Sequence, residues 1–528
     1  MKIIRAILSV VLAVSIITAA SGCSAMRGLT GGETLRILSG SENEELEQIL
    51  EACEKSTGVK IEITYKGSVD IMRELKNGAP GYDAVWTASS LWLSLGDEKH
   101  IVKHDESICT TPVIFGIKQS VAEELGLTDG EVSIKDILAA IEDGKLTFCM
   151  TSATQSNSGA SAYIGFLYSL LGKSDALTNG DLAKPELKEQ ITKLLSGVER
   201  SSGSSGWLKD MFLAGDYDAM VNYECLIIDA DRELTQTGRE PLYAVYPYDG
   251  LSIADSPLGY LDHGSEKKEE AFLKVQDYLF SDEAQSGIEA TGRRISLNGV
   301  SEQTKAVFKQ EWGIDTERIL SPITMPSADV LMNALNLWQS SFRKPSLTVY
   351  CLDFSGSMEG EGNSQLLSAM QQVLVQKYAE ANLLQAAEGD VNIVVTFDDD
   401  ILNVYTSEGS DADSLRALYE NVRRELIGGG TDIYKAAQYA VELIGGSYDP
   451  SAYTAAVILM TDGASQTYSK AEFEEFYLEN GGDIPVFSIM FGSAESEQLD
   501  DIALLTNARV FDGRKDLVSA FRSMKGYN

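Results

Sequence analysis

Two apolar runs in the last third of the chain each end in residues with oxygen-bearing side chains. Leu347–Leu352 is followed by Asp353, and Ala455–Met460 is followed by Thr461 and Asp462. Short apolar runs of this kind are typical of strands buried on both faces of a parallel sheet. Residues that follow parallel strands gather at one edge of the sheet, where open α/β sheets bind ligands. The pattern therefore predicts an α/β domain with a polar site at that edge.

The rest of the C-terminal region supports this fold class. Further strands are expected at Val391–Phe397 and Val486–Phe491, and helices at Gln365–Glu380, Ser414–Arg424 and Ile433–Leu443. Strands that alternate with helices indicate a doubly wound parallel sheet. We expect this domain to cover residues 345–528.

Oxygen ligands for a hard cation occur in three segments that such a fold brings together. The candidate ligands are Asp353, Ser355, Ser357, Thr431 and Asp462. Carboxylate and hydroxyl oxygens suit Mg²⁺ or Mn²⁺, and Mg²⁺ takes about six oxygens at about 2.0–2.1 Å. Because this set is mostly neutral, we expect an open coordination position for water or a visiting carboxylate. The alternative is that these residues only form turns and helix caps.

This constellation resembles the metal-ion-dependent adhesion site of von Willebrand factor A domains, from about Pro345 to the C-terminus. The resemblance implies that Asp353, Ser355, Ser357 and Thr431 hold Mg²⁺, and that Asp462 ligates it directly or through water. It also implies a protein partner whose Glu or Asp completes the ion. Asp432 is expected to orient the ligands. A second cation site at Asp398–Asp400 is less favoured than a solvated loop.

The N-terminal half predicts a second α/β region. Strands are expected at Leu35–Leu38, Lys60–Tyr65, Tyr82–Trp86, Pro112–Ile117, Lys145–Met150, Tyr217–Cys225 and Leu242–Pro247. Helices are expected from Ser39–Ser41 to about Lys55, at Ile134–Glu142, from Ser158-Gly159 through Leu171, and at Glu269–Leu279. This order resembles type 2 periplasmic solute-binding proteins, which implies two lobes joined by crossing strands around a ligand cleft.

Serine-rich loops are the candidate ligand-binding groups of that cleft. Hydroxyl and backbone N–H groups at helix N-termini bind anions without a counter-charge. We therefore expect an oxyanion or a carboxylate-bearing small molecule, although for any single serine a simple helix cap is the favoured alternative. The candidate residues are Ser39, Ser41, Ser156, Asn157 and Ser158, with Ser68, Thr87 and Asp255 chosen by their position in the resemblance.

The chain begins with a short basic segment and an apolar run to Ala20, followed by Ser21-Gly22-Cys23. This is typical of a secretory signal peptide. It resembles the lipobox of bacterial lipoproteins, which implies acylation of Cys23 and anchoring to the outer face of the cytoplasmic membrane, extracellular or periplasmic. The alternative is an ordinary signal peptide with a chance cysteine.

Five segments follow from these patterns. A helix over Ser327–Phe342, with Val330, Leu331, Leu335 and Trp338 on one face, predicts a connector or a helix of one domain. The expected segments are residues 1–22 (signal peptide), 23–34 (tether), 35–326 (two-lobed domain), 327–344 (connector) and 345–528 (metal-binding domain).

Composition limits the function. A net charge of −36 argues against nucleic acid and anionic membrane surfaces as partners. The five cysteines besides Cys23 leave open one disulfide among Cys109, Cys149 and Cys225. No Ser-His-Asp or Cys-His signature is apparent, so binding is favoured over catalysis. A receptor for a protein partner is the first hypothesis, a transport component the second, and a metal-dependent enzyme the third.

Overall fold

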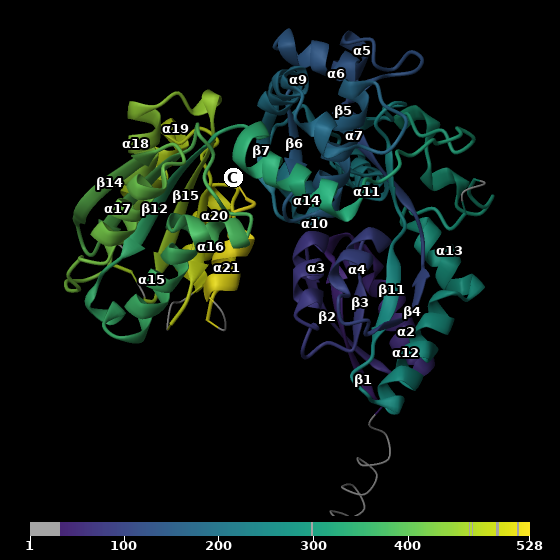
Figure 1. Cartoon of the computed structure of the whole chain (residues 1–528), viewed down its shortest axis with the longest axis horizontal. Helices are drawn as coiled ribbons and strands as arrows, with labels where there is room; N and C mark the ends of the chain where they lie inside the picture. Colours follow the sequence, from purple (N-terminus) through teal and green to yellow (C-terminus); the bar gives the residue numbers. More distant parts are fainter. Residues whose placement is uncertain are drawn as a thin grey trace, which may run out of the picture.

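The structure is a computed structural model that describes residues 32–296, 299–463, 465–466, 468–492, 496–514 and 517–527. The expected signal peptide, Cys23 and most of the tether lie outside these residues. The described chain forms three α/β bodies, which are two N-terminal lobes and a C-terminal domain (Figure 1). Within the described residues, no helix is long and apolar enough to cross a membrane.

The first lobe is built on a five-stranded sheet of order β2-β1-β3-β11-β4. Strands β1, β2 and β3 are parallel, and β11 runs antiparallel to its neighbours. The strands are β1 (Thr34–Gly40), β2 (Lys60–Lys66), β3 (Ala84–Trp86), β4 (Val102–Ser107) and β11 (Pro257–Leu261); the helices are α2 (Glu47–Thr57), α3 (Ser68–Lys76), α4 (Ser90–Gly96), α12 (Glu266–Leu279) and α13 (Asp282–Ala290).

The second lobe has its own six-stranded sheet, of order β10-β5-β8-β6-β7 with β9 paired to β5. Helix α7 is buried along almost its whole length and forms the centre of this lobe. The strands are β5 (Thr111–Lys118), β6 (Phe148–Thr151), β7 (Val198–Ser202), β8 (Ala219–Tyr223), β9 (Leu242–Val245) and β10 (Ser252–Ala254); the helices are α5 (Gln119–Glu124), α6 (Ile134–Glu142), α7 (Asn157–Leu171), α8 (Asn179–Leu182), α9 (Pro185–Ser196), α10 (Ser205–Ala214) and α11 (Glu224–Gln236).

The chain crosses between the lobes at two adjacent strand pairs, β4 to β5 and β10 to β11. A backbone hydrogen bond joins these crossings, since Ile108 N donates to Ser256 O at 3.2 Å. Ser256 N also donates to Ala88 O, in the loop after β3, at 2.9 Å. The crossing strands implied by the two-lobed resemblance are therefore present.

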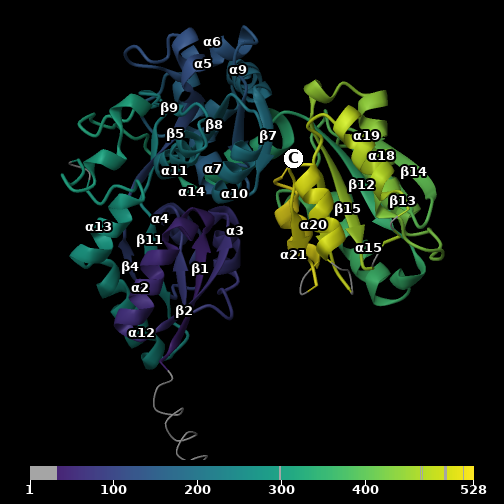
Figure 2. The ribbon, with the colours of Figure 1, turned by 180° about the vertical axis from the view of Figure 1, so that it is seen from behind.

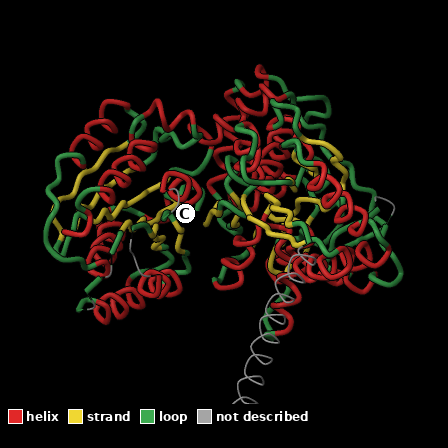
Figure 3. The backbone as a smooth tube through the Cα atoms, turned by 90° about the horizontal axis from the view of Figure 1, so that it is seen from below, coloured by secondary structure: helices red, strands yellow, loops and turns green. Residues whose placement is uncertain are grey.

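The C-terminal domain is a doubly wound sheet of order β14-β13-β12-β15-β16-β17 with helices on both sides (Figure 3). Helices α15, α17 and α21 cover one face, and α18, α19 and α20 cover the other. The strands are β12 (Ser346–Asp353), β13 (Val391–Phe397), β14 (Ile401–Glu408), β15 (Thr454–Thr461), β16 (Val486–Met490) and β17 (Val510–Asp512); the helices are α15 (Glu361–Leu374), α16 (Gln376–Ala381), α17 (Ala412–Val422), α18 (Ile433–Ser447), α19 (Lys470–Asn480), α20 (Ser496–Leu505) and α21 (Leu517–Met524).

The connector segment forms helix α14 (Ala328–Leu337) and then a π-helical turn at Trp338–Phe342. Its predicted apolar face is buried against the second lobe, where the Tyr163 hydroxyl donates to Ala334 O at 2.9 Å. Figures 1 and 2 show the C-terminal domain beside this lobe, with the C-terminal end of the chain at their junction. The connector thus packs on one lobe and leads into the other domain.

Several expected elements differ from the structure. The helix expected from Ser39 starts later, because Ser39 and Gly40 extend β1 in register with β2; a 3₁₀ turn over Ser41–Leu46 then precedes α2. The strand expected to reach Cys225 ends at Tyr223, where α11 begins. The helix expected at Gln365–Glu380 breaks at Val375, whose backbone is extended. The buried cysteines Cys109, Cys149 and Cys225 are free thiols, so the bridge left open by the sequence is absent.

Candidate metal and ligand sites

Oxygen atoms gather at the carboxyl ends of the neighbouring parallel strands β12 and β15. The fully buried Asp353 accepts a hydrogen bond from the Ser355 amide at 2.8 Å and another from the Thr461 hydroxyl at 2.7 Å. The Ser357 hydroxyl donates to Asp462 Oδ1 at 2.8 Å and lies 3.0 Å from the Ser355 hydroxyl. Strand register places these groups together, because β12 and β15 pair side by side up to Leu352 and Met460.

The loop with Thr431 joins the same cluster through its backbone. Gly356 N donates to Gly429 O at 3.2 Å, and Gln466 N donates to Thr431 O at 2.8 Å. The second loop thus lies against both the first and the third. Gly429 has a φ of +75°, and a Cβ there would meet the Asp398 carboxylate at 2.4 Å, so this close approach requires glycine.

The residues of this cluster suit a hard divalent cation. The carboxylates of Asp353 and Asp462 both contact this cluster of hydroxyl groups. Burial raises the pKa of Asp353, and the nearby Asp462 raises it further by a smaller amount. A cation between them would offset this repulsion. Among the described residues no group of three or more His, Cys, Asp or Glu side chains is placed to hold a metal. The candidate set has three hydroxyl side chains besides its two aspartates.

Neighbouring acidic residues have other contacts. Asp432 caps α18, since Oδ1 accepts from Lys435 N at 3.1 Å, and its Oδ2 accepts from the Ser469 hydroxyl at 2.6 Å. Asp399 accepts from Gly430 N at 3.1 Å, whereas Asp400 pairs with Lys435 at 2.9 Å. Asp398 Oδ1 accepts from Asp400 N at 2.8 Å, so the three consecutive aspartates have different partners. Thr461 was missed by sequence reasoning, although strand register alone would have placed it beside Asp353.

The candidate cleft residues lie where the lobes meet, and most of their polar groups have partners within the protein. Ser39, Ser41, Ser68, Thr87, Ser156, Asn157 and Ser158 are buried. The Ser68 hydroxyl accepts from Ala88 N at 3.1 Å, and the Ser158 hydroxyl lies 2.8 Å from that of Thr151. Thr87 donates to Ser89 O at 2.9 Å within a turn. Asp255 lies on the crossing segment, where it accepts from Ser90 N at 2.8 Å.

The two lobes touch directly across the cleft. The Ser41 hydroxyl lies 3.3 Å from that of Ser205 in the second lobe. Trp92 in the first lobe donates from its indole nitrogen to Asn157 Oδ1 at 2.7 Å. Val69 N donates to Gln155 O at 2.9 Å. The lobes are thus closed on each other at these contacts.

The C-terminal domain contacts both lobes close to this junction. The Arg522 guanidinium pairs with Asp70 of the first lobe, while Arg522 O accepts from Gln155 Nε2 of the second at 2.8 Å. Beside it, the Tyr527 hydroxyl donates to Ser204 Oγ at 3.1 Å.

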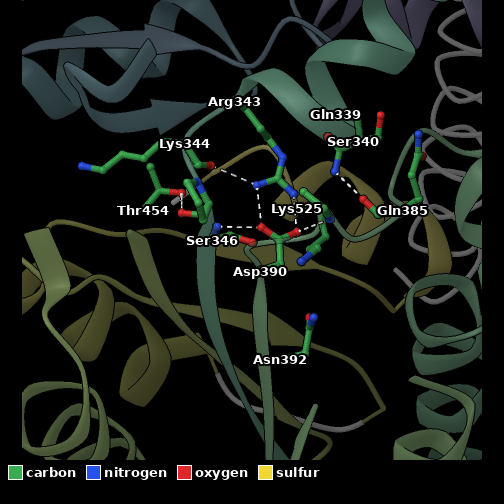
Figure 4. Close-up of polar contacts among 12 residues, drawn as sticks. Gln339, Ser340, Arg343, Lys344, Ser346, Gln385, Asp390, Asn392, Thr454 and Lys525 are labelled. Carbon is green, nitrogen blue, oxygen red and sulfur yellow. Dashed lines mark hydrogen bonds and ion pairs between the residues drawn. The ribbon is translucent and has the colours of Figure 1, made fainter. Parts of the chain in front are cut away.

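At the entrance to the C-terminal domain, Arg343 forms a two-pronged ion pair with Asp390 (Figure 4). Asp390 also accepts from Ser346 N at 2.8 Å, and the adjacent Gln339 donates to Gln385 O at 2.9 Å. These contacts fix the connector to the first strand of the domain.

Comparisons with known proteins agree with this architecture. Residues 35–294 match the family of bacterial extracellular solute-binding proteins, and residues 348–464 match the von Willebrand factor type A (VWA) domain, a span that holds all five candidate metal ligands. The chain combines a solute-binding domain with a VWA domain, which confirms the resemblance to these two domain families and the α/β fold class expected from the sequence. A search of curated proteins found no match.

Several solved structures match this chain at low sequence identity. The periplasmic binding protein P5PA is 15% identical, with a TM-score of 0.42 over 59% of this chain and 100% of its own. AfuA from Actinobacillus pleuropneumoniae, solved with fructose-6-phosphate, is 14% identical, with a TM-score of 0.42 over 59% of this chain and 98% of its own. A von Willebrand factor type A protein from Catenulispora acidiphila is 22% identical, with a TM-score of 0.29 over 35% of this chain and 43% of its own.

Proposed function

We propose that this chain is a surface binding protein that holds a small solute between its lobes and grips a protein partner through a Mg²⁺ or Mn²⁺ site in its VWA domain. Anchoring by an acylated Cys23 is part of the proposal and rests on the sequence alone. The observation that carries the proposal is the convergence of Asp353, Ser355, Ser357 and Asp462 at the carboxyl end of the sheet.

In the proposed site, Asp353, Ser355, Ser357, Thr431 and Asp462 hold the cation. The bound ion would supply positive charge for a carboxylate of the partner. This charge is needed, because a chain with a net charge of −36 repels acidic surfaces. Thr461 fixes Asp353 through its hydroxyl, so the carboxylate keeps its orientation with or without a partner.

We also propose that the two binding events are coupled. Arg522 contacts Asp70 of one lobe and Gln155 of the other, so parting of the lobes must break one of these contacts. A solute that favours closed lobes therefore favours the docked VWA domain, and linkage makes the effect reciprocal.

A second candidate function is solute delivery to an ABC-type transport system, which is favoured by the family match of residues 35–294. Solute delivery needs only the two lobes. This chain adds a VWA domain that contacts the second lobe beside the junction. Binding rather than catalysis is proposed for both domains.

The proposed partner interaction is tested by capturing surface proteins from intact cells on the immobilised chain. A partner is expected to stay bound in Mg²⁺, to elute with chelator, and to be lost with Thr431→Ala. Thr406→Ala, an exposed threonine on β14, is the matched control and should retain the partner. Retention of the same proteins by both variants with and without chelator contradicts the proposal.

A further inference from the structure

A buried glutamate that the sequence patterns did not single out lies at the junction of the lobes. Glu42 follows β1 in the 3₁₀ turn at Ser41–Leu46, next to the contact between Ser41 and Ser205. Its carboxylate folds back over Gly40, where an added Cβ would lie 2.1 Å from Oε1. Only 5% of Glu42 is exposed.

Two hydrogen-bond acceptors at this place lack donors among the described residues. They are Glu42 Oε1 and Asn43 Oδ1, and Asn43 is completely buried. The Asn43 amide is oriented by its own nitrogen, which donates to Ser39 Oγ at 3.1 Å. Buried polar atoms normally have partners, and leaving one unpaired costs about 1–3 kcal/mol. Both unpaired atoms require a donor.

The nearby charges do not supply that donor. The buried Arg293 donates to the backbone oxygen of Glu42 and to the Thr291 hydroxyl at 2.6 Å. Burial raises the pKa of Glu42 to about 7, and Glu44 also raises it; the peptide backbone, Arg293 and Ser205 lower it. The donors of Arg293 are bonded elsewhere, and Glu42 Oε1 has no donor among the described residues.

The hydroxyls expected to bind an anion are already engaged. The Ser41 hydroxyl accepts from Gly206 N at 3.3 Å, and the Ser39 hydroxyl donates to Gly40 O at 3.2 Å. An anion placed beside them would also face the Glu42 carboxylate. The unpaired atoms at this junction thus favour a ligand that brings hydrogen-bond donors and positive charge.

We propose that the junction of the lobes binds a small cationic molecule, an amine or a related nitrogen cation, with Glu42 as its counter-charge and Asn43 as a second acceptor. This assignment rests on the proposed solute-binding function of the lobes. It replaces the oxyanion expected from the serine-rich loops with a ligand of opposite charge.

The test uses the full chain and three probe panels of similar size: mono- and diamines such as putrescine, neutral sugars and polyols such as glucose, and oxyanions such as phosphate. Thermal unfolding detects binding, and calorimetric titration measures the affinity. At least one amine is expected to bind, with no response to the other two panels at the same concentration.

Substitutions test whether Glu42 is responsible for amine binding. Glu42→Gln keeps the side-chain shape and removes a buried charge, so it is expected to fold and to bind the amine at least tenfold more weakly. Glu51→Gln removes an exposed charge from the following helix, α2, and should bind within twofold of the parent chain. Amine binding that survives Glu42→Gln overturns the inference, as does binding of only sugars or oxyanions. Failure of every panel contradicts the solute-binding function itself.

Discussion

Asp390→Ala is expected to lower the free energy of unfolding by about 3–5 kcal/mol, because it breaks a buried ion pair and leaves one charge without a partner. The Asp390 side chain is 3% exposed and that of Arg343 is 14% exposed. Besides the guanidinium, the carboxylate accepts from the backbone N–H groups of Ser346 and Ala387, both at 2.8 Å. Alanine would leave these two backbone N–H groups unpaired and remove the carboxylate that Arg343 binds (Figure 4).

Urea unfolding measures this loss, and Asp411→Ala is the matched control. Asp411 is an exposed aspartate that caps α17 by accepting from Ser414 N at 2.8 Å. Loss of such a cap costs about 1 kcal/mol. A loss for Asp390→Ala no larger than that of the control would show that the pair does not hold the connector to the VWA domain.

A double-mutant cycle on Arg522 and Asp70 is expected to give a coupling energy of about 1–3 kcal/mol, the range for hydrogen-bonded charges with limited exposure. The two side chains are 22% and 12% exposed and belong to the VWA domain and the first lobe. The cycle compares Arg522→Ala, Asp70→Ala and the double variant by their free energies of unfolding. It measures directly whether the VWA domain docks on that lobe.

The exposed pair Arg514 and Asp512 provides the reference, with side chains 52% and 47% exposed. Exposed pairs contribute about 0–1 kcal/mol. An Arg522–Asp70 coupling energy near zero would mean that the domain does not rest on the first lobe, and the proposed link between lobe closure and VWA docking would fail.

Strands and helices of the C-terminal domain could be predicted well because its buried strands are continuous apolar runs. Val391–Phe397 was predicted with the bounds that the structure gives. The antiparallel edge strand β14 was missed, because it is mostly exposed and carries no apolar run. Strands were predicted from continuous apolar runs, which reflect burial, so an exposed edge strand is hard to predict in this way.

The two aspartates of the proposed metal site could be found from the sequence because each follows a buried strand. Asp353 and Asp462 could be placed at one edge of the sheet without coordinates. The ligand of the cleft was harder to predict, because polar residues at a helix N-terminus can form either a helix cap or an anion site. Glu42 could not be found this way, because only the folded chain shows that its carboxylate is buried against Gly40 and the second lobe.

The most direct test of the account is calorimetric titration of Mg²⁺ and Mn²⁺ into the purified full chain, alongside Asp353→Ala. We expect one binding site in the parent chain and at least a hundredfold weaker binding in the variant, because Asp353 is a proposed ligand and also the acceptor for Ser355 and Thr461. The control Asp400→Ala removes an exposed acid paired with Lys435, and this variant should bind the cations as tightly as the parent chain. Equal binding by Asp353→Ala and the parent chain, or no binding by either, would contradict the proposed metal-dependent site.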